Sequence, residues 1–171
     1  NAAIVLENVA FWDIYYEHCS YFSPGSLGRL FRSCGFEVLD LYTDFEDQYL
    51  MIEARPAESQ SARCHPREEP VYEMIDRADR FIARVEERKG RWLRLLKEHD
   101  AAGKRPVIWG SGSKCVGFLT TLGIDDEIGC VVDINPRRHG KYMAGCATRI
   151  EAPEYLKEYK PRTIIAMNPI Y

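Results

Sequence analysis

The chain has 171 residues, of which 46% are hydrophobic and 29% charged, and its formal net charge is −3. This composition is typical of a globular protein with one domain or two small ones and excludes a disordered chain. The slightly acidic charge gives no indication of nucleic-acid binding. No apolar run approaches the roughly 20 residues of a membrane helix, and no signal peptide is visible. We therefore expect a cytoplasmic protein.

Six cysteines are scattered along the chain, and none forms a Cys-x-x-Cys pair. Zinc sites usually show short paired spacings, so we predict no metal site and expect reduced thiols, most of them buried. Cys64-His65 is the one metal-like neighbour pair, and it lies in a segment that reads as a linker.

The first 56 residues predict a helix followed by a hairpin. Residues 3–12 fit a short helix and a strand equally well. Ser23 as N-cap, Pro24 at the first helical position and Gly35 at the far end bracket a helix. The stretches "FEVLDLY" and "QYLMIEA" flank the tight acidic turn 44–47 and predict an antiparallel β-hairpin.

A linker and a long helix follow. Residues 55–70 contain three prolines and little to bury, which is typical of a linker. From Val71 to about His99, apolar residues recur at alternating steps of four and three, which predicts one long helix with an apolar stripe. Its many charged residues predict a solvated face.

Beyond Gly103 the pattern changes to alternating strands and helices. "RPVIWG", "IGCVVDINP" and "RTIIAMNP" read as strands, and "SGSKCVGFLTTLG" and "APEYLKEYK" as helices between them. This alternation predicts a parallel sheet with crossover helices.

The loop Gly110-Ser111-Gly112-Ser113-Lys114 joins the first of these strands to a helix. Glycines at this place let the backbone approach a phosphate, and the helix N-terminus favours an anion. Asp133 ends the next strand, where an acid can bond a ribose hydroxyl. Cys115 stands where a dinucleotide fingerprint has its third glycine, so a phosphate site and an empty tight turn both remain open.

A second candidate site is the aromatic loop that contains Tyr15, Tyr16, Glu17 and His18, just before the Ser23 cap. Histidine can remove a proton beside a carbonyl near neutral pH, and a tyrosine can stabilise the enolate. The alternative is a buried histidine among packed aromatics.

Several motifs, taken in order, resemble the sugar C-methyltransferases. They are "FWDIYYEHCSYFSPGSLGRLFRSCGFEVLDL", "VIWGSGSKCVGFL", "VVDINPRRHGKYMAG" and "MNPIY". The resemblance implies methyl transfer from S-adenosylmethionine to a carbon of a nucleotide-linked keto sugar. It also implies that His18 is the general base, supported by Glu17 and Tyr15. Residues Gly110, Ser111, Gly112, Lys114 and Asp133 then line a site for the nucleotide sugar.

The chain departs from the family pattern in two respects. The zinc-binding cysteines and the glycine-rich S-adenosylmethionine loop are absent, and the family continues beyond Tyr171. We therefore expect a C-terminal piece that is inactive alone. Its predicted parts are residues 1–56, the end of the methyltransferase domain; 57–70, the linker; and 71–171, the long helix with a Rossmann-like domain.

The expected fold class is thus α/β, with a Rossmann-like three-layer C-terminal domain preceded by a long helix and a partial methyltransferase sheet. The exposed hairpin edge predicts a homodimer or packing on the C-terminal domain. Two alternatives stay open: a non-catalytic Rossmann-like module that binds a nucleotide or sugar phosphate, and a nicotinamide-binding dehydrogenase relative.

Overall fold

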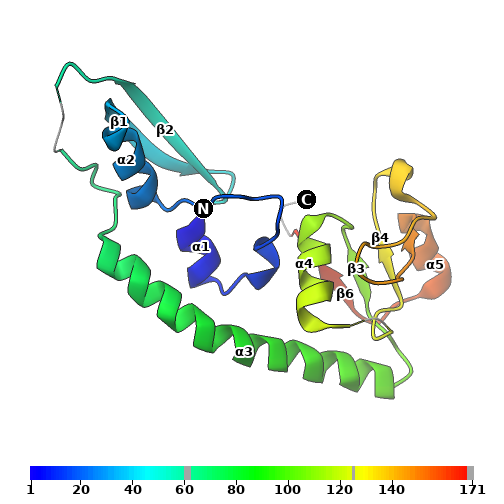
Figure 1. Ribbon diagram of the computed structural model, residues 1–171. Coiled ribbons are helices and arrows are strands. Elements are labelled where there is room, and N and C mark those ends of the chain that lie inside the picture. Colours follow the sequence, from blue (N-terminus) through cyan, green and yellow to red (C-terminus); the bar gives the residue numbers. More distant parts are fainter. Residues whose placement is uncertain (60–62, 125, 169–171) are drawn as a thin grey trace. The chain divides into compact units, whose positions relative to one another are not determined.

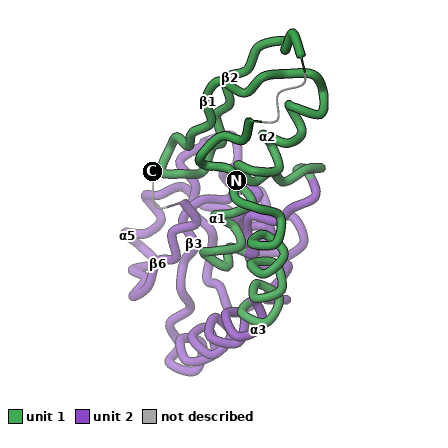
Figure 2. Tube along the Cα trace, turned by 90° about the vertical axis from the view of Figure 1, so that its left-hand side faces the viewer, with its two compact units in different colours: residues 1–10, 17–84 green, residues 11–16, 85–171 purple. Residues whose placement is uncertain are grey.

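The computed structural model describes residues 1–59, 63–124 and 126–168. The chain forms two compact units (Figure 2). Unit 1 comprises Asn1–Ala10 and Glu17–Arg84, and unit 2 comprises Phe11–Tyr16 and Val85–Tyr171. The boundary falls within one long helix, so each unit includes part of it. Within the described residues, no helix is both long and apolar enough to cross a lipid bilayer.

Unit 1 contains two short helices and a hairpin, followed by the first part of the long helix (Figure 1). These elements are α1 (Ala2–Glu7), α2 (Pro24–Ser33), β1 (Phe36–Asp44), β2 (Tyr49–Pro56) and α3 (Val71–Ala101). The first part of the ambiguous segment 3–12 is therefore helical, and residues 8–9 form a turn. The segment ends in a 3₁₀ turn, η1 (Phe11–Asp13), which belongs to unit 2.

Helix α2 begins and ends where its capping residues predict. The Ser23 Oγ accepts a hydrogen bond from the Ser26 N–H at 3.2 Å, and the Ser26 hydroxyl accepts one from the Ser23 N–H at 2.8 Å. Pro24 occupies the first turn, where a missing N–H costs no intrahelical bond. Gly35 follows the helix with φ +83°, a conformation that glycine adopts without steric cost. The predicted helix is confirmed.

The predicted hairpin is also confirmed, with β1 and β2 paired antiparallel and α2 packed against β1. The register shifts between Val38 and Asp40, which marks a β-bulge that the alternating sequence does not reveal. Leu41 is fully buried, whereas Leu39 and Tyr49 are about half exposed. One side of the hairpin is therefore covered by its own unit, and other apolar side chains face solvent.

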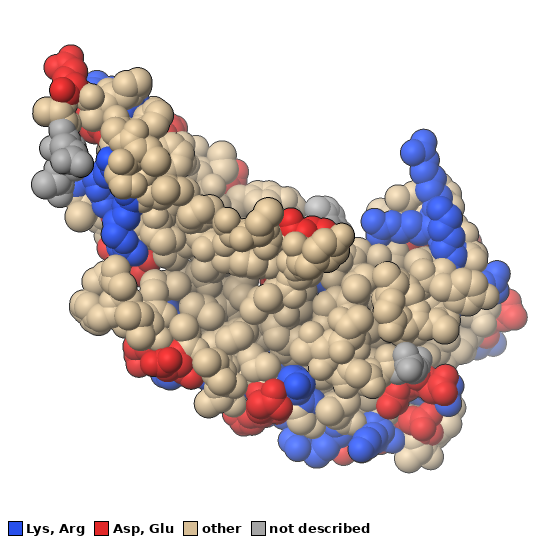
Figure 3. Space-filling view, viewed as in Figure 1, with Lys and Arg blue, Asp and Glu red and all other residues tan. Residues whose placement is uncertain are grey.

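The long helix is confirmed as α3, and its charged side chains pair along its surface. Figure 3 shows acidic and basic side chains interspersed along this helix. The ion pairs lie about one turn apart: Glu73–Arg77, Asp76–Arg80, Glu86–Lys89 and Glu87–Arg91. Such pairs stabilise a helix by only about 0.2–0.5 kcal/mol each, so they indicate the solvated face that the sequence predicts.

The apolar stripe of α3 is unevenly covered. Ile75 and Ile82, in the part that belongs to unit 1, are 57% and 69% exposed. In the part that belongs to unit 2, Leu96 is fully buried and the Trp92 ring meets Phe118 edge-on at 5.1 Å. The heptad-like pattern therefore predicts the helix correctly, but only its second half packs into a core.

Unit 2 contains a parallel sheet in the order β5-β4-β3-β6. Figure 1 labels three of its strands, β3, β4 and β6. Its strands are β3 (Val107–Trp109), β4 (Cys130–Val132), β5 (Ile150–Glu151) and β6 (Ile164–Ala166). Its helical elements are α4 (Ser113–Leu122), η2 (Pro136–Arg138), η3 (Pro153–Tyr155) and α5 (Leu156–Tyr159). The α/β class and the three predicted strands are confirmed. Strand β5 was not predicted because it is only two residues long.

The aromatic core of unit 2 holds η1 against α4. The Phe118 side chain, 1% exposed, stacks on Phe11 with ring centroids 6.1 Å apart and meets Trp12 edge-on at 6.3 Å. Gly117 admits the Trp12 carbonyl, since a Cβ there would lie 2.9 Å from that oxygen. The chain is thus firmly packed just before the loop that carries Glu17 and His18.

Candidate functional site

The loop with the predicted base connects η1 to α2 and exposes its polar residues. Glu17 and His18 are exposed in unit 1, and Tyr15 is half-buried in unit 2. The His18 ring meets Tyr21 edge-on, with centroids 5.7 Å apart. The structure therefore does not bury His18 in an aromatic core, and its imidazole lies where a substrate can reach it.

The far end of this loop is anchored within unit 1. The Phe22 carbonyl accepts a hydrogen bond from the Ala2 N–H at 2.7 Å. Ser23, the N-cap of α2, is only 2% exposed. These contacts anchor the end of the loop that belongs to unit 1, which carries Glu17 and His18. Loops held in this way by a rigid scaffold often carry binding and catalytic groups.

The glycine loop of unit 2 makes a sharp turn between β3 and α4. Gly110 has φ +101°, and its N–H donates to the Val132 carbonyl at 2.8 Å. Gly112 is the N-cap of α4 and provides no side-chain cap. The Lys114 Nζ lies 3.0 Å from Asp13 Oδ1, and both side chains are about one-fifth exposed. The lysine predicted to bind a phosphate is thus engaged by a carboxylate of the same unit.

The carboxylate of Asp133, 9% exposed, braces this loop. Its Oδ2 accepts hydrogen bonds from the N–H and the hydroxyl of Ser111, at 2.8 and 2.5 Å. Its Oδ1 accepts one from the Asn135 N–H at 2.8 Å. The structure therefore brings two predicted residues, Ser111 and Asp133, into direct contact.

Arg138 belongs to the same cluster and was not identified from the sequence. Its Nη1 donates to Ser111 Oγ and to Asp133 Oδ2, each at 3.1 Å. His139 Nε2 lies 2.7 Å from the Asp133 carbonyl oxygen, which can only accept, so Nε2 carries the proton. The run of basic residues Arg137-Arg138-His139, a few residues after the strand, was the signal in the sequence that could have identified it.

This cluster holds the Asp133 carboxyl in its charged form. Burial raises its pKa, but hydrogen bonds from Ser111 and Asn135 and the charge of Arg138 lower it more, so the net pKa lies below its ordinary value. The loop follows the carboxyl end of β3, which pairs with β4 on one side and with β6 on the other. Ligands of open parallel sheets bind at the carboxyl ends of the strands, where the strand order reverses in this way. The arrangement can therefore present a rigid turn to a ligand.

The cysteines correct one sequence-based expectation. Only Cys115 and Cys130 are buried, whereas Cys19, Cys34 and Cys64 are exposed. Burial raises the pKa of Cys115 to about 12 and that of Cys130 to about 11, so these two thiols stay protonated and unreactive. Among the described residues, no three His, Cys, Asp or Glu side chains gather as metal ligands.

Comparison with known proteins places the chain in a family. The family model of the C-methyltransferase C-terminal domain matches residues 52–169. The C-methyltransferase NovU of Streptomyces niveus is 31% identical over 170 residues, which cover 92% of this chain and 40% of the relative. The chain thus spans about two-fifths of the length of that relative. The sequence resemblance to C-methyltransferases is confirmed. The chain therefore belongs to the C-methyltransferase family, and residues 52–169 correspond to the C-terminal domain of that family.

Proposed function

We propose that this chain is part of an S-adenosylmethionine-dependent methyltransferase that methylates a carbon of a nucleotide-linked keto sugar or a similar acceptor. The observation that carries the proposal is the family match over residues 52–169. The relative from Streptomyces niveus is named a C-methyltransferase, and we extend transfer to carbon to the whole protein that contains this chain.

His18 is the proposed general base. Methylation at carbon needs a nucleophilic carbon, which a base creates by removing the proton beside a carbonyl. The proton moves to the imidazole, and the electron pair of the C–H bond becomes part of an enolate. Tyr15 stabilises the enolate by donating a hydrogen bond, and Glu17 orients the imidazole. The exposure of His18 in an anchored loop supports this assignment.

S-adenosylmethionine supplies the electrophilic methyl group when it is bound. We assign no residue of this chain to its binding. Asp133 ends a strand, as an acid that bonds ribose hydroxyls would, but both its carboxylate oxygens already accept hydrogen bonds from neighbouring protein groups. We therefore assign Asp133 to bracing the loop and not to a ribose, and we place the role of unit 2 with the acceptor.

We assign the diphosphate of the acceptor to the loop from Gly110 to Lys114. The strand order β5-β4-β3-β6 corresponds to the order 3-2-1-4 of a Rossmann-like sheet, whose first strand-to-helix turn binds phosphate. The N–H groups of Gly112 and Ser113 precede the first intrahelical donor of α4, and the helix dipole favours an anion there. Lys114 would exchange Asp13 for the phosphate, while Asp133 keeps the loop in shape.

A second candidate is a non-catalytic module that binds a nucleotide or sugar phosphate. The bracing of the glycine loop by Asp133 and Arg138 favours it, because a preorganised loop serves binding without chemistry.

Labelled S-adenosylmethionine and thymidine-diphosphate 4-keto sugars test the proposal on the whole protein that contains this chain. The expected result is label on the carbon beside the carbonyl. Binding of thymidine diphosphate without any methyl transfer to such acceptors would instead favour the binding module.

Replacing Lys114 by alanine is expected to weaken thymidine diphosphate binding by about 10- to 100-fold, because a hydrogen bond to a charged group contributes about 1.5–3 kcal/mol. The nucleotide should also protect the amides of residues 110–116 from hydrogen exchange. Lys157→Ala, on the exposed side of α5, is the control and should bind as the parent does. Absence of protection at millimolar nucleotide would contradict the assignment.

A further inference from the structure

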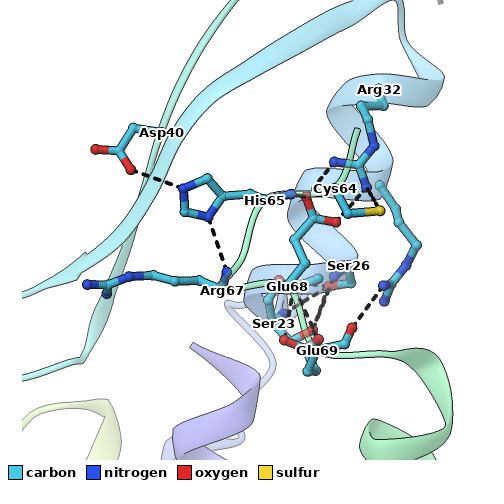
Figure 4. A network of polar contacts seen from close by, with 11 residues as sticks. Ser23, Ser26, Arg32, Asp40, Cys64, His65, Arg67, Glu68 and Glu69 are labelled. Carbon is cyan, nitrogen blue, oxygen red and sulfur yellow. Dashed lines mark hydrogen bonds and ion pairs between the residues drawn. The ribbon is translucent and has the colours of Figure 1, made fainter. Parts of the chain in front are cut away.

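Residues 63–70, which we call the strap, are bonded to both ends of helix α2 (Figure 4). At the last turn of α2, both carboxylate oxygens of Glu68 pair with the Arg32 guanidinium. Their side chains are only 3% and 11% exposed. The strap also reaches β1, where His65 Nε2 lies 3.3 Å from Asp40 Oδ1. A segment with the composition of a linker is therefore a fixed part of unit 1.

At the first turn of α2, the Glu69 carboxylate acts as a second cap. It accepts a hydrogen bond from the Ser23 hydroxyl, and the Gly25 N–H lies 3.1 and 3.0 Å from its two oxygens. A carboxylate at this place satisfies a helix N–H and complements the positive end of the helix dipole. Glu69 thereby holds the residue at which the loop of His18 ends.

The surface of α2 is shaped to admit the strap. A Cβ on Gly25 would overlap the Glu69 carbonyl, and one on Gly28 would lie 2.6 Å from Glu68 Oε1. Arg29 Nη1 donates to that same carbonyl at 3.1 Å. With Arg32 these residues follow the spacing i, i+3, i+4, i+7, so the strap occupies one complete face of the helix.

The hydrogen bond between Glu69 and Ser23 joins the strap to the end of the loop that contains His18. Ser23 is almost fully buried, and its hydroxyl meets both Ser26 and Glu69. The preceding residue, Phe22, is tied to Ala2. His18 lies in the short stretch before these anchors, so the direction in which the loop leaves α2 depends on the Glu69 contact.

We propose that Glu69 is a positioning residue for His18: its carboxylate fixes the start of α2 and thereby the loop that presents the imidazole. The inference rests on the proposed role of His18 as the base. The Glu68–Arg32 pair keeps the strap on α2, and Glu69 transmits that placement to the loop. Glu69 itself need not contact the substrate.

Hydrogen exchange on the 171-residue chain tests the structural part. Glu69→Gln is expected to speed exchange of two amides by about tenfold or more, because a charge-assisted hydrogen bond is weakened. They are the Gly25 amide, which donates to the carboxylate, and the Ser23 amide, which donates to the neighbouring Ser26 hydroxyl. Glu73→Gln, which removes an exposed carboxylate from the first turn of α3, is the matched control and should leave these rates unchanged. Unchanged exchange in Glu69→Gln would overturn the proposal.

Steady-state kinetics on the whole methyltransferase test the positioning part. Glu69→Gln is expected to lower kcat by about tenfold with little change in KM, since the substrate still binds but the base is misplaced. Faster exchange with an unchanged kcat would also overturn the proposal. A failure of the proposed function would be seen in a different variant. His18→Ala would then keep full activity, whatever the hydrogen-exchange rates of the Glu69 variant.

Discussion

Replacing His18 by alanine is expected to lower the kcat of the whole methyltransferase by about 10²–10⁴-fold, the usual contribution of a general base. Binding of both substrates should persist, because the imidazole is exposed and supports no core packing. Glu17→Gln should cost less, since an amide can still orient the ring. Stopped assays of methyl transfer at saturating substrate measure both effects.

His99→Gln is the matched control for this substitution. His99 lies in the last turn of α3 in unit 2, where its Nε2 is 3.3 Å from the Thr163 hydroxyl, and an amide can make a similar contact. Its kcat should stay close to that of the parent. If Glu17→Gln loses more activity than His18→Ala, the carboxylate takes the proton and the assignment of the base is wrong.

Replacing Glu68 by alanine is expected to reduce the free energy of unfolding by about 3–5 kcal/mol, because it leaves the almost buried Arg32 guanidinium without its partner. Urea unfolding followed by circular dichroism measures the change. Glu73→Ala, which breaks the exposed pair with Arg77, should change stability by less than about 1 kcal/mol. Similar small losses in both variants would show that the strap contributes little to folding.

The same pair predicts how stability depends on pH. Burial raises the pKa of the Glu68 carboxyl, but the bonds from Arg32 and the His65 N–H lower it more, so the net pKa lies below its ordinary value of 4.5. A carboxyl with a lowered pKa contributes stability that is present above its unfolded pKa and lost as the pH falls through its folded pKa. Between pH 5 and about 3, stability should therefore fall more steeply in the parent than in Glu68→Gln.

Local signals explain what could be predicted from the sequence. Ser23, Pro24 and Gly35 act through backbone geometry within a few residues, and they mark the bounds of α2 correctly. The parallel α/β class follows from buried strands alternating with amphipathic helices. The family resemblance, confirmed by comparison, came from motifs spread over most of the chain.

Contacts between distant residues explain what could not be predicted. The strap has few apolar residues, and its attachment depends on Glu68 and Glu69 meeting a helix about 40 residues earlier in the chain. Arg138 reaches Ser111 only because two strand ends lie side by side. The pattern of α3 cannot reveal which turns will be covered, because coverage depends on what packs against each turn.

Solvent deuterium exchange at the substrate carbon, without S-adenosylmethionine, tests the central claim most directly. If the proposal is correct, the whole protein in D₂O should replace the proton beside the carbonyl of the proposed keto-sugar acceptor, because the proposed base forms the enolate before any methyl transfer. His18→Ala should slow this exchange by at least about 100-fold. Exchange in His18→Ala as fast as in the parent would contradict the account, because another residue would then be the base.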